Sequence, residues 1–136
     1  MNRPMSFGNV PADMLVGAVE KLLAKMDETD LAAQYTRELS TMPPDAYSAF
    51  VEAVFAAFRE RGESSEDAAE GAGTTLESIA SQDGRAVNDL LAYARTNPDL
   101  LKEATTLFVE RRPDLVTALP EMLRNALAQR LAQSLP

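Results

Sequence analysis

Apolar residues recur at spacings of three and four along almost the whole chain. This spacing places them on one face of an α-helix. Runs that alternate apolar and polar residues between Asn-Gly or Asp-Gly turns would indicate strands, and such runs do not occur. The pattern therefore predicts an all-α protein, either a compact bundle or an orthogonal stack of six to eight short helices.

The N-terminal residues 1–9 lack this periodicity, so we expect a flexible arm there and a single helical domain over residues 10–136. A first helix is predicted from about Pro11 to Met26. The polar stretch 27–30 then ends this helix and caps a second one. The second helix is expected to end at the prolines that precede Asp45.

The segment from Pro44 to Arg61 has the strongest pattern. Its large apolar side chains fill a broad arc of the helix, and its alanines fill a neighbouring arc. The large residues are Tyr47, Phe50, Val51, Val54, Phe55 and Phe58. A helix that is apolar over most of its circumference belongs in the interior, so this segment is predicted to be the central helix.

Helix signals continue through the middle of the chain. Gly62 ends the central helix, and residues 64–67 and 74–77 both have the form of a capping box. Two glycines in residues 68–73 predict a break between the boxes, because each costs about 1 kcal/mol inside a helix. In the short helix after the second box, Leu76, Ile79 and Ala80 can pack against the rest of the domain. Asp83-Gly84 is expected to end that helix, and another follows from Arg85.

Proline marks the later boundaries. Residues 97–99 and 112–114 both combine a proline with an aspartate, as two helix starts would, and the shared Pro-Asp-Leu could also mark an internal repeat. Pro120 must either kink the last helix or restart it.

Leucines continue at intervals of four residues to the end of the chain. Leu119, Leu123, Leu127 and Leu131 form an apolar stripe. Such a face has to be covered, either by folding back on the domain or by a second copy in a twofold homodimer. These four leucines are therefore the candidate interaction face.

Composition narrows the chemistry. Hydrophobic residues make up 46% and charged residues 25% of the 136, the balance of a globular domain. Neither cysteine nor histidine is present, which excludes disulfides, imidazole-dependent catalysis and sulfur- or imidazole-ligated metals. The net charge of −8 argues against nucleic acid and anionic membranes as partners. With no apolar stretch of signal or membrane-spanning length, we expect a soluble cytoplasmic protein.

The charged clusters have simple interpretations. Glu63, Glu66, Asp67 and Glu70 would share a helix face, but no calcium loop is present, and a solvated first turn is favoured. The arginine pairs at 59/61 and 111/112 are expected at helix C-termini, where they offset the helix dipole. We predict no catalytic residue, metal or cofactor.

These observations favour a non-catalytic helical module that binds a protein partner and self-associates. Two alternatives remain. A stripe of Phe50, Phe55 and Phe58 with several methionines could line a pocket for a small apolar ligand, which would make the protein a carrier. An enzyme that uses only carboxylates, arginine and hydroxyls is the other.

Overall fold

The computed structural model describes residues 10–134, which form eight α-helices and two 3₁₀ helices and contain no strand. The α-helices are α1 (Ala12–Ala24), α2 (Glu28–Glu38), α3 (Pro44–Glu60), α4 (Ser65–Ala72), α5 (Leu76–Ala80), α6 (Gly84–Arg95), α7 (Leu100–Arg111) and α8 (Glu121–Ser134). The 3₁₀ helices are η2 (Leu39–Thr41) and η3 (Pro113–Ala118). The all-α prediction is confirmed. The predicted arm, residues 1–9, lies outside the described residues.

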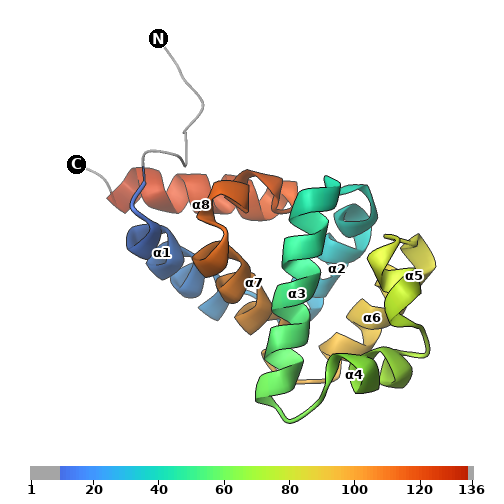
Figure 1. Ribbon diagram of the computed structural model, residues 1–136. Coiled ribbons are helices and arrows are strands. Elements are labelled where there is room, and N and C mark those ends of the chain that lie inside the picture. The colour runs from blue at the N-terminus through green and yellow to red at the C-terminus, as the bar shows by residue number, and fades with distance from the viewer. Residues whose placement is uncertain (1–9, 135–136) are drawn as a thin grey trace.

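Helix α3 stands in the middle of the molecule (Figure 1). Helices α1, α7 and α8 lie on one side of it, and α4, α5 and α6 lie on the other. The principal contacts join α3 to α7, α1 to both α7 and α8, and α6 to both α2 and α4. In Figure 1, α8 crosses the direction of α3 at a steep angle, so the helices form a crossed stack around α3.

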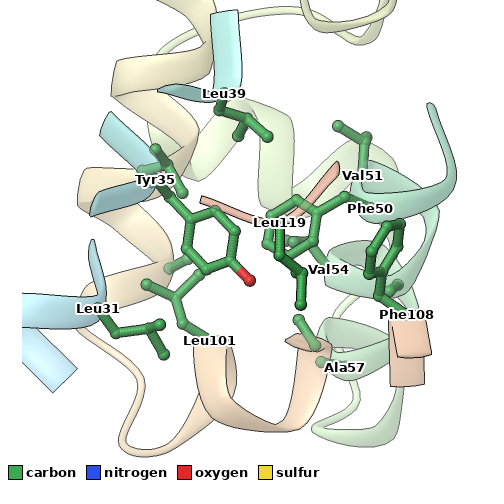
Figure 2. Close-up of a cluster of buried hydrophobic side chains, with 14 of the residues drawn as sticks. Leu31, Tyr35, Leu39, Phe50, Val51, Val54, Ala57, Leu101, Phe108 and Leu119 are labelled. Carbon is green, nitrogen blue, oxygen red and sulfur yellow. The ribbon is translucent and has the colours of Figure 1, made fainter. Parts of the chain in front are cut away.

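The core is centred on α3, as predicted. Ten of its 17 residues are buried. The ring of Phe50 stacks on the ring of Tyr35 from α2, with 4.3 Å between the ring centroids. Phe108 from α7 meets the Phe50 ring edge-on, with 5.9 Å between the centroids. Figure 2 shows these rings among aliphatic side chains that include Leu31, Leu39, Val54, Leu101 and Leu119. The Tyr35 hydroxyl bonds to the Thr105 hydroxyl at 2.6 Å, which satisfies both buried polar groups.

Several predicted helix boundaries are confirmed. Asp27 caps α2 by accepting a hydrogen bond from Thr29 N at 2.7 Å. Ser64 caps α4 in the same way, accepting from Asp67 N at 3.1 Å. Gly62 has φ 82°, the left-handed conformation expected just after a helix. These boundaries are predictable because the capping residue and the capped amide are close in sequence.

The expected break in residues 68–73 is only partly correct. Helix α4 continues through Gly71 and ends at Gly73, whose φ is 81°. Gly71 leaves room for the ring of Tyr93, because a Cβ at this position would lie 2.6 Å from Cζ of Tyr93 and the ring would have to shift. The second cap is Thr75 and not the first residue of the predicted box, since Thr75 Oγ1 accepts from Ser78 N at 3.1 Å.

Asp83 also acts differently from the prediction. The short helix α5 already ends at Ala80, and Asp83 instead caps the start of α6. Its carboxylate accepts hydrogen bonds from Arg85 N at 2.9 Å and from Ala86 N at 3.2 Å.

The two proline-marked starts differ from the prediction as well. Helix α7 begins after Asp99, which has φ 63° and makes no side-chain cap. The backbone amide of Leu101, in the first turn of α7, instead donates a hydrogen bond to Glu28 Oε1 from α2 at 3.1 Å. Burial raises the pKa of the Glu28 carboxyl group. Residues 113–118 form η3 and not an α-helix.

Pro120 restarts the chain as α8. The first amide of α8, at Glu121, donates to both carboxylate oxygens of Glu38, at 3.2 and 3.1 Å. Helix α2 therefore supplies caps to two other helices, Glu28 from its first residue and Glu38 from its last. The bond from Glu28 takes the place of a local cap at residues 97–99, and the bond from Glu38 caps a helix for which no cap was predicted.

Two glycine substitutions should have opposite effects. Gly17, in α1, has no packing neighbour within 4 Å of the position that a Cβ would take, so Gly17→Ala should stabilise the protein by roughly 0.5–1 kcal/mol. Gly71→Ala should destabilise it by roughly 1–3 kcal/mol, because Tyr93 is fixed by stacking on Phe58 at 5.5 Å. Urea unfolding of both variants measures the difference. Equal stabilisation by both substitutions would contradict the packing of Tyr93 on α4.

Candidate functional site

A cleft of about 500 Å³ opens between α3 and α5. Its lining is mostly apolar with a few hydroxyl and amide groups, and it includes Ser65 at the start of α4. The lining residues are Pro44, Tyr47, Ser48, Val51, Glu52, Phe55, Ser65, Leu76, Ile79, Ala80, Ser81 and Gln82.

Helical spacing positions one wall of the cleft. Tyr47, Val51 and Phe55 are four residues apart and therefore lie on one face of α3. Val51 and Phe55 are 7% and 5% exposed, so their side chains form a nearly covered floor. Leu76, the first residue of α5, is 37% exposed at the opposite wall. It is one of three large apolar side chains exposed among the described residues, so of Leu76, Ile79 and Ala80, which could pack together, Ile79 alone is buried.

Two polar anchors hold the α5 wall against the rest of the fold. The Tyr47 hydroxyl donates a hydrogen bond to the carbonyl of Ile79, in α5. Just after α5, the side-chain Nε2 of Gln82 lies within hydrogen-bonding distance of three backbone carbonyls, those of Leu39, Ser40 and Met42, at 3.1, 3.2 and 2.7 Å. Gln82 has φ 61°, a conformation that costs a non-glycine residue about 1–2 kcal/mol. The three carbonyls fix this strained residue in place.

The cleft has one charged residue in its lining. This residue, Glu52, is exposed. Burial, and then the carboxylate of Asp83, raises the pKa of Tyr47 to about 12, so this hydroxyl is a hydrogen-bond donor at neutral pH. Three serines line the cleft, but the chain has no histidine or cysteine to activate one or to act as a nucleophile itself.

The candidate interaction face lies elsewhere and is covered. Leu119, Leu123, Leu127 and Leu131 are 3%, 2%, 1% and 0% exposed. Helix α8 packs on α1. In the folded single chain these leucines are thus covered by the rest of the domain. The sequence could not distinguish folding back from dimerisation, because an apolar helix face has the same periodicity whichever surface covers it.

The charged clusters are distributed over several helices. The Tyr93 hydroxyl donates to Glu63 at 2.5 Å, and the other three acids of that cluster are exposed. Over residues 10–133, no group of three or more acidic side chains is arranged to hold a metal ion. Arg61, at the end of α3, donates to the carbonyl of Ala57 at 3.0 Å and pairs with Glu103 at 2.8 Å. This is the C-terminal position expected for an arginine of the 59/61 pair.

Comparison with models of protein families, with curated proteins and with solved structures finds no match for this chain. None of the helices described is long and apolar enough to cross a membrane. Any assignment of function therefore has to come from the surface geometry of the chain itself.

Removing the Tyr47 hydroxyl tests how the cleft wall is held. Tyr47→Phe should destabilise the fold by about 1 kcal/mol at neutral pH, because the Ile79 carbonyl loses its donor. The raised pKa also has a consequence at high pH. Stability that depends on the neutral hydroxyl is present below pH 10, the ordinary pKa, and is lost as pH rises through about 12. Urea unfolding across this pH range should show a smaller loss of unfolding free energy in Tyr47→Phe than in the unmodified chain. An identical loss in both would contradict this role.

Proposed function

We propose that the protein is a non-catalytic interaction module whose α3–α5 cleft binds an amphipathic helix of a partner protein. The observation that carries the proposal is the combination of an apolar floor at Val51 and Phe55 with an exposed leucine at the rim, Leu76. Apolar grooves of this kind accept the apolar face of a helix, whose anchors recur at three- and four-residue spacing.

Charge defines the chemistry of the partner. The cleft contains one carboxylate, Glu52, and no cation, and the chain carries a net charge of −8. A basic residue beside the apolar anchors of the partner helix would therefore find a favourable contact in the cleft and a favourable long-range field during approach. The expected partner helix is apolar on one face and basic at the edge of that face.

The degree of burial elsewhere supports this choice of surface. Most apolar side chains of the described helices are buried in the core. The large apolar residues that are exposed among those described are Met14, Leu76 and Met122. Of these, Leu76 lines the α3–α5 cleft of about 500 Å³, whereas Met14 lines a smaller pocket of about 260 Å³. A partner that needs apolar contact therefore finds an exposed apolar side chain next to a concave surface at this cleft.

Self-association stays a prediction, and the structure changes the form that it would take. The C-terminal leucines are already buried within the chain. A dimer that used them would require α8 to leave its own α1 and pack on that of a second copy, which is an exchange of helices. A dimer of two unaltered folds would need a different surface.

A synthetic helix tests the cleft directly. The probe carries leucines at positions i, i+3, i+4 and i+7, lysines beside them and a fluorescent label. We expect it to bind the unmodified chain and to lose at least about tenfold in affinity with Leu76→Asp, because a carboxylate then faces the apolar contact. Met122→Asp is the matched control, since Met122 is 59% exposed on α8 and does not line the cleft. Fluorescence anisotropy measures both affinities.

The remaining outcomes decide against the proposal. Equal binding by both variants would place the contact outside the cleft. Binding of a small apolar molecule such as decanol, with no binding of the helix, would support the carrier alternative instead. Glu52→Lys provides a second check, because it should weaken the lysine-bearing probe and leave a version with glutamine in place of lysine unchanged.

A further inference from the structure

A second groove, of about 550 Å³, lies between α2 and α6 and has the opposite charge to the cleft. Its charged lining residues are Arg37 and Arg95, and no acidic residue lines it. The other lining residues are Thr29, Ala32, Ala33, Thr36, Asn88, Leu91 and Ala92. A groove of purely positive charge is unexpected on a chain with 21 acidic and 13 basic residues.

Neither arginine has an ion pair or hydrogen bond with any of the residues that the structure describes. Both side chains are exposed. Each lies in the last turn of its helix, where a cation offsets the helix dipole. The dipole explains one cation at each helix end, but it does not explain why every acid of this acidic chain is absent from the groove between them.

Helices α2 and α6 run antiparallel. Gln82, just before α6, bonds to carbonyls at the end of α2, so the start of α6 lies beside the end of α2. Arg37 and Arg95 therefore stand at opposite ends of the groove. The part of α6 that lines the groove runs from Asn88 to Arg95, seven positions later, which corresponds to about 10 Å along the helix.

Small residues make the space between the arginines suitable for a helix. Ala32 and Leu91 form the buried floor, at 4% and 2% exposed. Ala33 and Ala92 are exposed along the groove and have side chains short enough to allow the backbone of another helix to approach closely. Carboxylates two turns apart on such a helix are also separated by about 10 Å, a span similar to the part of α6 that lines the groove, from Asn88 to Arg95.

We propose that the α2–α6 groove binds an acidic helix of a partner protein, with two carboxylates about two turns apart that pair with Arg37 and Arg95. Guanidinium groups bind carboxylates through two parallel hydrogen bonds, which gives the contact direction as well as strength. The groove would thus select a partner whose charge is opposite to that of the helix proposed for the α3–α5 cleft. The two sites are independent, and either can fail without the other.

The test uses a labelled alanine-based helix with glutamates seven residues apart, and a matched peptide with glutamines at those positions. We expect the glutamate peptide to bind the full chain and the glutamine peptide not to bind. Arg37→Gln with Arg95→Gln should reduce the affinity about tenfold or more, and rising salt should reduce it as well. Arg85→Gln is the control, because Arg85 is exposed on α6 and lies outside the groove.

Three results would overturn the proposal. The first is equal affinity for the glutamate and glutamine peptides, and the second is a loss of affinity with Arg85→Gln equal to that of the double variant. The third is displacement of the peptide by inorganic phosphate at a concentration no higher than that of the competing peptide. The last would identify a small-anion site and not a helix-binding groove. Circular dichroism of the variants shows whether the fold is intact, so that unfolding is not mistaken for loss of the contact.

Discussion

The rest of the fold depends on the burial of α3 on nearly all of its sides. Phe50 stacks on Tyr35 at 4.3 Å and meets Phe108 edge-on at 5.9 Å, so α2 and α7 are joined through α3. Paired aromatic rings contribute about 0.5–1.5 kcal/mol beyond the burial of their area. Because the alanines of α3 also have to be covered, other helices must surround it, and the crossed arrangement in Figure 1 results.

The same constraint explains why the proposed binding cleft lies where it does. Helix α5 spans only five residues, from Leu76 to Ala80, whereas α3 spans 17. So short a helix does not fill the space beside the α3 face that carries Val51 and Phe55, and a cleft remains there. The wall keeps its position through the hydrogen bonds of Tyr47 and Gln82 and through the buried side chain of Ile79.

The sequence predicted features that depend on neighbouring residues and missed those that depend on distant ones. The bounds of α3 and the caps at Asp27 and Ser64 follow from local periodicity and local hydrogen bonds. The caps from Glu28 and Glu38 join residues 73 and 83 positions apart, so no local pattern indicates them. The cleft was missed for a related reason. The spacing of Leu76 and Ile79 suits a buried face, and only the packed arrangement determines that Leu76 is exposed.

Native-state hydrogen exchange tests the central claim, that the fold is organised around α3. If α3 is the last element to open, its amides near Phe50 should exchange only through global unfolding, with a protection that matches the free energy of unfolding measured with urea. Amides of α5 should exchange through a local opening of lower free energy. Slower exchange in α5 or α8 than in α3 would contradict the account, because another element would then form the stable centre of the molecule.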